Sequence, residues 1–268
     1  MMKRKILNCM PFALLLIPSS IMADSQLNFS VGYERTIGDY DQENTTEITS
    51  IPLTMQYMED AWRLRVSVPF ISVTGDGSVT PGINGAVKSD SDSLSSGSGS
   101  NSNVSAVETD SGLGDIMTSV SYALLPQTSA MFYEITTSVK WGTASAKKGL
   151  GSGENDYSVS LYSLYQKHKL KPFINVGYLF MGDTNVIDYN DVFFANPGLL
   201  YSVGPHTSFS FSYNYQQATT DITDESQSLS LYANQRLSKQ WSGSAFIFAG
   251  LTDSVADTGL GLSLTHSF

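Results

Sequence analysis

Cysteine, long apolar runs and positive charge are all scarce in this sequence. Its 268 residues include a single cysteine, Cys9, in an N-terminal stretch that we expect to be removed, so the remaining chain has no disulfide and no thiol chemistry. Beyond that stretch no run reaches the roughly 18 apolar residues that a transmembrane helix requires. Asp and Glu number 25 against 15 Lys and Arg. Because nucleic acid attracts positive charge, this acidic balance excludes it as a natural partner.

The N-terminal residues have the pattern of a cleaved secretory signal. Lys3, Arg4 and Lys5 precede an apolar run at residues 10–17, and Ala23 offers a small side chain for cleavage. We therefore predict a signal peptide over residues 1–23. Its removal leaves 12 Lys and Arg against 25 Asp and Glu, a formal charge of −13 on an exported chain.

Beyond the signal, polarity alternates with a period of two through segments of about 10 residues, as in a transmembrane β-strand. In the clearest segment Trp62 and Leu64 alternate with Arg63 and Arg65. Two arginines among large apolar side chains do not fit a dry core, but they fit a strand between lipid and a wet lumen. Twelve segments are predicted, at residues 26–34, 46–57, 62–70, 114–124, 130–142, 157–166, 172–181, 192–203, 207–217, 226–237, 240–251 and 259–268. The prediction is weakest where a proline removes a ladder donor, at Pro52, Pro69, Pro172 and Pro197.

The links between these segments are alternately short and long. Five links are tight turns, and the alternate links are longer and acidic. Outer-membrane barrels have short turns at one end and long loops at the other, whereas a soluble sandwich or lipocalin gives no reason for such alternation. For residues 24–268 we predict an all-β fold: a transmembrane antiparallel up-and-down β-barrel of about 12 strands, with long extracellular loops and short periplasmic turns. The even strand number would place both termini on the periplasmic side.

The longest link, residues 74–111, is rich in Ser, Gly, Asn and Asp. Such a composition buries too little apolar surface to order itself strongly. We predict a mobile extracellular loop rather than a domain linker, because the strand pattern resumes unchanged after it. In a channel this loop would act as a lid or constriction.

The last segment, 259–268, places Leu260, Leu262, Leu264 and Phe268 on one face. It resembles the terminal strand of Gram-negative outer-membrane barrels, in which the barrel-assembly machinery recognises a C-terminal aromatic residue. The resemblance makes Gly261, Leu264 and Phe268 the candidate assembly signal. A barrel has no free edges only if this segment pairs with the first one.

Several short glycine-rich motifs carry a family resemblance. They are Ser111-Gly112-Leu113-Gly114-Asp115-Ile116, Lys140-Trp141-Gly142-Thr143, Gly149-Leu150-Gly151-Ser152-Gly153, Asp156-Tyr157, Gly177-Tyr178 and Gly182-Asp183. Over residues 111–183 the chain resembles the outer-membrane transporter family named for the phenol meta-cleavage degradation pathway. It departs from that family at Gly142-Thr143-Ala144, where the family has Pro-Thr-Gly. The resemblance implies an outer-membrane channel, with uptake of small aromatic or hydrophobic compounds in some members, and no catalytic residues.

Charged residues on the polar faces are the candidates for lining a pore. In one interpretation they form a field that selects solutes, and in the other they pair across the lumen and fill it. These candidates are Glu34, Arg63, Arg65, Asp115, Glu134, Lys140 and Lys171. Four phenylalanines also fall on inward positions and form either an apolar track or ordinary packing: Phe132, Phe173, Phe246 and Phe248.

Aromatic residues near segment ends fit the girdles of a membrane barrel. They are Trp62, Trp141, Tyr201, Trp241 and Phe268. The acidic loops either share divalent cations with lipopolysaccharide or are simply solvated, and they lack the spacing of a calcium loop. Catalysis would need a histidine near a nucleophile, but only His168, His206 and His266 remain, scattered over two turns and one strand. We predict neither enzymatic activity nor a cofactor.

The sequence therefore predicts a channel for passive passage of small solutes through the cell outer membrane. Its expected partners are outer-membrane lipid and lipopolysaccharide, the barrel-assembly machinery and a small-molecule solute. The alternative is a closed structural or surface-interaction barrel whose loops bind lipopolysaccharide or an external ligand without transport. A soluble periplasmic binding barrel is a third possibility.

Overall fold

The computed structural model describes residues 25–40, 43–76, 79–82, 85–88, 107–124, 129–184, 188–221 and 223–268. The predicted signal peptide, residues 1–23, lies outside these ranges. Among the described residues, no helix has the length and apolar character to cross a membrane.

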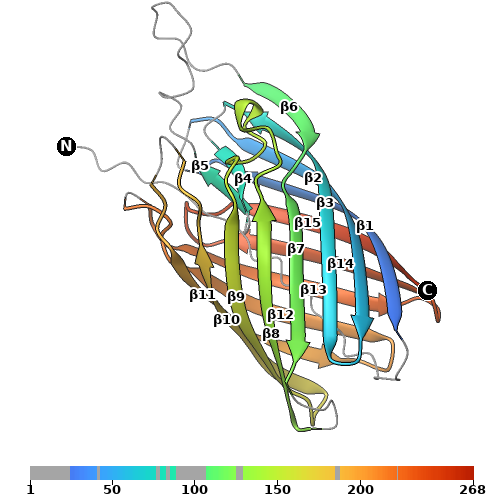
Figure 1. Cartoon of the computed structure of the whole chain (residues 1–268). Helices are drawn as coiled ribbons and strands as arrows, with labels where there is room; N and C mark the ends of the chain where they lie inside the picture. Colours follow the sequence, from blue (N-terminus) through green and yellow to red (C-terminus); the bar gives the residue numbers. More distant parts are fainter. Residues whose placement is uncertain are drawn as a thin grey trace, which may run out of the picture.

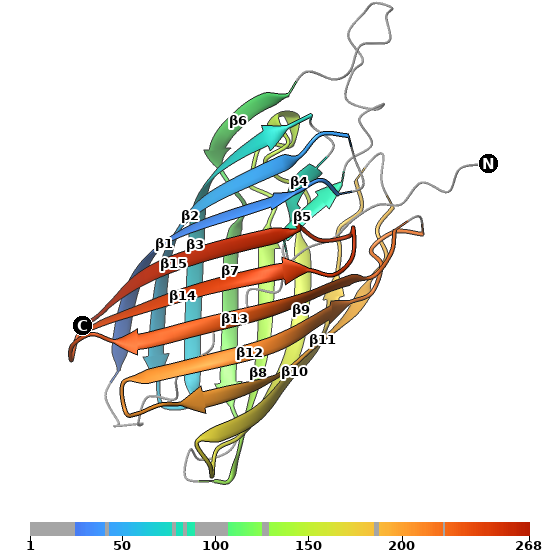
Figure 2. The ribbon, with the colours of Figure 1, turned by 180° about the vertical axis from the view of Figure 1, so that it is seen from behind.

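Twelve antiparallel strands close into a barrel, as predicted (Figures 1 and 2). Each strand pairs with its neighbour in the chain, and β15 closes the barrel on β1 through a register that runs from Asn28↔Ser267 to Ile37↔Thr258. The barrel strands are β1 (Gln26–Gly38), β2 (Thr46–Glu59), β3 (Trp62–Gly75), β7 (Ile116–Ala123), β8 (Met131–Trp141), β9 (Asp156–Tyr165), β10 (Leu170–Phe180), β11 (Val192–Ser202), β12 (Thr207–Gln216), β13 (Ser226–Arg236), β14 (Trp241–Gly250) and β15 (Thr258–Ser267). Each begins and ends close to a segment predicted from polarity, except β1 and β3, which continue to Gly38 and Gly75.

The 74–111 segment, predicted as a long mobile extracellular loop, is partly in strands. It contains a hairpin of β4 (Val79–Gly82) and β5 (Gly85–Lys88), and β6 (Glu108–Leu113) pairs with the end of β3. Alternating polarity does not predict β6, because its sequence, Glu-Thr-Asp-Ser-Gly-Leu, has little apolar character. Residues 89–106 lie outside the described part of the chain.

A β-bulge separates β6 from β7, and both strands pair with β3. Between the pairs Ser67↔Met117 and Phe70↔Leu113 there are two residues on β3 and three on the opposite segment. The extra residue interrupts the alternation of inward and outward side chains, as bulges do. As a result, Gly114 and Asp115 are both buried although they are consecutive.

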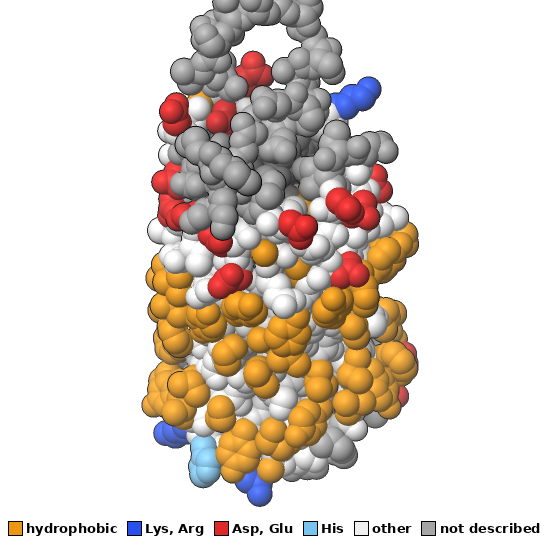
Figure 3. All heavy atoms as spheres, turned by 90° about the vertical axis from the view of Figure 1, so that its left-hand side faces the viewer, with side chains coloured by type: hydrophobic (Ala, Val, Ile, Leu, Met, Phe, Trp, Pro, Cys, Tyr) orange, Lys and Arg blue, Asp and Glu red, His pale blue; other side chains and the backbone are white. Residues whose placement is uncertain are grey.

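The outer surface carries a broad apolar band (Figure 3). The five predicted girdle aromatics all face outward, each with at least 42% of its surface exposed: Trp62, Trp141, Tyr201, Trp241 and Phe268. Most acidic side chains in this view gather at the long-loop end. Basic side chains lie at the opposite end, although basic side chains are also exposed at the long-loop end, where Lys147 and Lys148 lie. The exposed basic residues of the short turns include Lys167, Lys169, Arg236 and Lys239, against Glu59 and Asp60.

The four prolines at which the strand prediction is weakest all lie inside strands. Two of them, Pro52 and Pro197, coincide with gaps in the hydrogen-bonded ladders. Pro52 and Pro69 face one another across β2 and β3, where neither needs a partner for an N–H group. The β1–β2 ladder lacks pairs opposite Pro52, and the β11–β12 ladder lacks pairs at Asn196 and Pro197. Side chains nevertheless continue to alternate between the outer and the inner face along these strands, and none of the strands ends at its proline.

Inside the barrel, phenylalanine rings lie over glycines of the neighbouring strand. The pairs are Phe173–Gly198, Phe194–Gly177, Phe246–Gly261 and Phe248–Gly259, and in each pair the two residues are directly opposite in the register. A Cβ on any of these glycines would overlap the ring. The glycines thus let aromatic rings lie against the wall, a device known to support curved sheets. The predicted inward direction of Phe132, Phe173, Phe246 and Phe248 is confirmed.

Candidate functional site in the barrel lumen

The lumen holds apolar clusters as well as polar side chains. One cluster draws on seven strands, β7 to β11, β13 and β14. It combines Phe132, Leu164, Phe173, Leu200 and Tyr232 with the half-buried Ala123, Tyr162 and Phe246. Between and beyond the clusters the inner wall carries buried serines, asparagines and charged groups. The lumen is therefore amphipathic, and narrowed by its own side chains.

Arg63 and Glu134 form an ion pair across the inner wall. The Nη1 atom of Arg63 lies 2.9 and 2.8 Å from the two carboxylate oxygens of Glu134, and the two side chains expose 16% and 5% of their surface. The pair reaches from β3 to β8 over Ser121 of β7, which pairs with Arg63 in the register. These two candidates are thus paired with each other.

Arg65 and Glu34 behave differently from that pair. They lie within electrostatic range of one another. Within the described part of the chain, neither side chain makes a hydrogen bond or an ion pair. Both are half-buried on inward positions. Like Lys171, another of the predicted lumen charges, these two keep their hydrogen-bonding groups available to ions or solutes.

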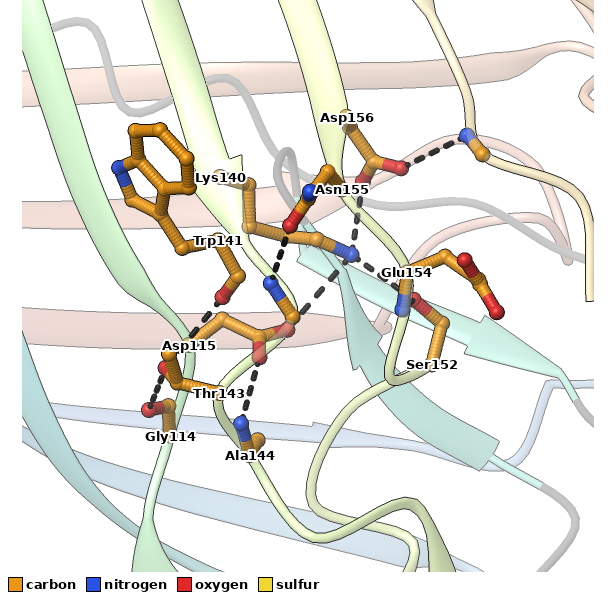
Figure 4. Close-up of polar contacts among 12 residues, drawn as sticks. Gly114, Asp115, Lys140, Trp141, Thr143, Ala144, Ser152, Glu154, Asn155 and Asp156 are labelled. Carbon is orange, nitrogen blue, oxygen red and sulfur yellow. Dashed lines mark hydrogen bonds and ion pairs between the residues drawn. The ribbon is translucent and has the colours of Figure 1, made fainter.

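A buried ion-pair cluster forms around Lys140 at the long-loop end of β8 (Figure 4). The ammonium of Lys140 lies 2.7 Å from Asp156 Oδ2 and 3.6 Å from Asp115 Oδ2, and it donates to Ser152 Oγ at 2.9 Å. Lys140, Asp115 and Asp156 expose 2%, 8% and 1% of their surface. One cation between two carboxylates at this depth holds its neighbours in place, because removing any member leaves a buried charge uncompensated. We call Asp115, Lys140, Ser152 and Asp156 the lysine cluster.

The lysine cluster anchors backbone as well as side chains. Asp115 accepts the N–H of Ala144 at 2.8 Å, and Asp156 accepts the N–H of Gly182 at 3.0 Å. The β6–β7 bulge, the strand end at Lys140, the β8–β9 loop and the β10–β11 loop therefore meet at one point. These are the places where the family-like motifs lie, and the resemblance included Asp156, which our list of pore-lining residues omitted.

The β8–β9 loop, residues 142–155, folds inward over this cluster. It contains the short 3-10 helix η1 (Ala146–Lys148), and Leu150 packs with Ile71, Val73 and Ala144. Gly151 is required because a Cβ there would lie 2.7 Å from Asp115 Oδ2. The glycine-rich motif thus serves close packing at the mouth of the barrel.

A second loop, between β14 and β15, also turns into the barrel. Val255 and Ala256 expose 1% and 0% of their surface and pack with Tyr40, Val79 and Phe248. The loop is tied to the start of β13 by the hydrogen bond from Ser226 Oγ to the carbonyl of Ser254, at 3.0 Å. This arrangement cannot be predicted from the sequence, because the loop has only the pattern of a short acidic link.

Tyr189 of the β10–β11 loop lies near the lysine cluster. Burial raises the pKa of Tyr189 to about 12, and the nearby charge of Asp156 adds to the effect. Its backbone N–H donates to Asp183 Oδ1 at 2.8 Å, which holds the loop. Parts of three loops therefore lie at the long-loop mouth.

The remaining sequence candidates lie away from the lysine cluster. Lys171 is half-buried on β10 and makes no ion pair with another described residue. Leu264 and Phe268 face outward, and the N–H of Phe268 donates to the carbonyl of Leu27 at 2.9 Å. Gly261 is buried beneath Phe246. Within the described ranges, no three His, Cys, Asp or Glu side chains are grouped as a metal site would require.

Comparison with known proteins places the chain by its fold. No family model matches it, and no curated protein matches it. The crystal structure of the COG4313 outer membrane channel from Pseudomonas putida F1 is similar, with a TM-score of 0.64 at 14% identity, covering 94% of this chain and 99% of that one. The NanC porin has a TM-score of 0.53 at 9% identity over 90% and 98% of the two chains. The KdgM porin has 0.52 at 10% identity over 89% and 99%. The chain thus shares its fold, a closed antiparallel β-barrel, with these three outer-membrane proteins.

Proposed function

We propose that this protein is an outer-membrane channel that passes small solutes passively. The observation that carries the proposal is the pairing of an apolar exterior with a polar, charged inner wall in a closed barrel. Such a barrel satisfies every backbone group between its strands, and it is the form in which strands cross a bilayer. The fold neighbours, which are named as a channel and as porins, support the same function.

In this proposal Arg65 and Glu34 set the ionic preference of the lumen. The charges of Arg63 and Lys140 are matched by carboxylates at 2.8 and 2.7 Å, so their fields are largely cancelled. Arg65 and Glu34 have no such close partner in the described part of the chain. Rings and clusters of charge at a constriction control which ions enter a pore.

The proposal extends to location, assembly and solute. The apolar band would meet outer-membrane lipid, the acidic long loops would face lipopolysaccharide, and Gly261, Leu264 and Phe268 would present the assembly signal. The 74–111 segment would cover the outer mouth. Aromatic or hydrophobic compounds are the solutes that the family resemblance implies, and the aromatic cluster around Phe173 offers them an apolar surface.

Single-channel recording tests this function. The refolded protein should give discrete conductance steps in a planar bilayer, and a salt gradient should give a reversal potential that reports ion preference. Arg65→Glu should shift the reversal potential toward cation preference. Lys171→Glu serves as the control for an inward cation nearer the short turns, and it should shift the potential less.

The competing function is a closed barrel without transport. The packed clusters inside the lumen favour it, since small barrels fill their interiors with side chains. Absence of conductance from protein that shows heat-modifiable mobility would refute the channel and leave this structural role. Loss of attachment to lipopolysaccharide on deleting residues 89–107, with permeability unchanged, would support it directly.

A further inference from the structure

The inner wall of the barrel is packed on one side of the lumen and open on the other. Along β12 every inward side chain from Ser208 to Gln216 exposes at most 7% of its surface. Most inward side chains of the five adjacent strands β14, β15, β1, β2 and β3 are instead half-buried. They include Ser30, Ser50, Gln56, Ser67, Ser244 and Ser263. We call this part of the wall the open side of the lumen, because solvent reaches its side chains.

Arg65 on β3 and Glu34 on β1 are charged residues of this open side. They lie within electrostatic range of one another, but no nitrogen of Arg65 lies within 4.0 Å of a carboxylate oxygen of Glu34. Solvent also reaches their polar atoms. The buried polar atoms without hydrogen-bond partners in the described part of the chain include Nε of Arg63, but no atom of Arg65 or Glu34. The two charges are therefore near one another, separate, and accessible.

The other lumen charges leave this pair as the charged part of the open side. Arg63, two residues before Arg65, is bound to Glu134 at 2.8 Å. Lys171 lies on β10, which does not belong to the open side. An anion that approaches Arg65 meets the like charge of Glu34, and a cation that approaches Glu34 meets that of Arg65. A solute that carries both charges gains both contacts.

An aromatic surface lies beside Glu34. Glu34 pairs with Gly261 in the β1–β15 register, and Gly261 pairs with Phe246 in the β14–β15 register. The ring of Phe246 lies over Gly261 and is half-buried. Its centroid is 5.5 Å from that of Tyr232, the next residue along this row. Aromatic rings associate with such surfaces in edge-to-face or offset arrangements. The carboxylate of Glu34 therefore has an apolar neighbour that a solute ring can contact.

We propose that Arg65 and Glu34 bind a free amino acid as its zwitterion, with an aromatic side chain toward Phe246. The guanidinium of Arg65 receives the carboxylate of the solute, for which its planar fork of N–H donors is suited. The carboxylate of Glu34 receives the ammonium group. This inference rests on the proposed channel function, because it names the class of solute that the channel holds on its way through.

Three ligands that share a ring and a chain length test the charge requirement. They are L-phenylalanine, 2-phenylethylamine, which lacks the carboxylate, and 3-phenylpropionate, which lacks the ammonium. Isothermal titration calorimetry on the detergent-refolded barrel at neutral pH should show phenylalanine binding about tenfold tighter than either singly charged ligand, as expected for one additional charge-assisted hydrogen bond. Glycine should bind more weakly than phenylalanine, because it offers no ring to Phe246.

Replacing one charge at a time should change the preference in opposite directions. Arg65→Gln should weaken phenylalanine binding about tenfold and strengthen that of phenylethylamine, because the repulsion is removed while Glu34 remains. Glu34→Gln should weaken phenylalanine binding similarly and strengthen that of phenylpropionate. Arg65→Lys keeps the charge and should keep the preference for phenylalanine over phenylethylamine. Lys169→Gln and Glu59→Gln remove exposed charges near the short turns and should bind like the wild type. Heat-modifiable mobility verifies that each variant is folded.

The outcomes separate this inference from the channel function. Discrete conductance without phenylalanine binding, or with the same ligand preference in Arg65→Gln and Glu34→Gln, overturns the inference and leaves the channel. The opposite shifts in a barrel that does not conduct sustain the site and refute the channel. Tighter binding of either singly charged ligand by the wild type overturns the assignment to zwitterions. Equal binding of glycine and phenylalanine overturns the contact with Phe246.

Discussion

The ring of Phe246 on β14 lies directly over Gly261 on β15, so that a Cβ at position 261 would overlap the ring. Phe248 and Gly259 repeat this arrangement two residues along the same strands. Two aromatic rings thus lie against the strand that closes the barrel on β1. Gly261 also belongs to the candidate assembly signal, so its packing and its recognition have to be separated by experiment.

Gly261→Ala should destabilise the barrel by about 1–3 kcal/mol, because the ring of Phe246 must leave its position. The measurement is urea unfolding of the purified protein in lipid vesicles. Gly243→Ala is the matched control on β14, since its Cβ would meet nothing closer than 3.6 Å. Phe246→Leu in the Gly261→Ala background should recover part of the loss. A Gly261→Ala protein of unchanged stability that fails to assemble in cells would instead make this glycine a recognition element.

Lys140→Met should release the β8–β9 loop, because Asp115 and Asp156 would remain buried without their cation. Breaking a buried ion pair from one side costs about 3–5 kcal/mol. Lys147 and Lys148 are exposed in η1, so trypsin cleavage at these residues reports the release. Lys171→Met removes a lysine without an ion pair to a described residue and should leave the cleavage rate unchanged. Equal cleavage of both variants would show that the lysine cluster does not hold the loop.

Arg63 and Glu134 should show strong coupling in a double-mutant cycle. Arg63→Met alone leaves a buried carboxylate and Glu134→Gln alone leaves a buried guanidinium, so each should cost several kcal/mol of unfolding free energy, about 3–5. The double variant should be markedly more stable than the sum of the two losses predicts, because neither charge is then left alone. Additive losses in vesicle unfolding would contradict the pairing.

Val255→Ser should loosen the β14–β15 loop by removing an apolar side chain that is 1% exposed. Losing the burial of this side chain should cost about 1.5–3 kcal/mol. The cost should destabilise the inward position of the loop and leave the strands intact. We expect longer open times in single-channel records, with conductance of the open state little changed. Asp253→Asn, an exposed change in the same loop, should leave the open time at its wild-type value. Unaltered gating in Val255→Ser would show that this loop does not control opening at the mouth of the barrel.

The strands followed from the sequence because their information is local. Alternation of polarity with period two, as in Phe209 to Tyr215 of β12, depends only on the two faces of a strand and survived even at Pro197. The inward direction of Arg63, Glu134 and Lys140 followed for the same reason. The same local pattern fails to predict β6. Its polar residues pair with β3 although they present no apolar face.

The partners of the lumen charges did not follow from the sequence, because they depend on how far each strand is shifted against the next. That Arg63 meets Glu134 over an intervening strand, while Arg65 in the same strand has no ion pair among the described residues, is set by the register of β3, β7 and β8. Asp156 is not among the predicted pore-lining residues, because it is the first residue of its strand and lies beside a loop. The inward turn of Val255 and Ala256 depends on packing with distant segments, which no short sequence window contains.

The long loops carry an excess of acidic side chains and the short turns an excess of basic ones, and this unequal distribution gives the barrel a permanent electrical direction. Fixed charges of opposite sign at the two mouths concentrate cations at one and anions at the other. In a conducting barrel, a voltage of one polarity then drives the accumulated ions inward, and the reverse voltage drives them away. The current should therefore rectify at low ionic strength, and the asymmetry should vanish as the Debye length shrinks to about 3 Å in 1 M salt. A protein inserted in one orientation would thus report, by the sign of its rectification, which end faces which solution.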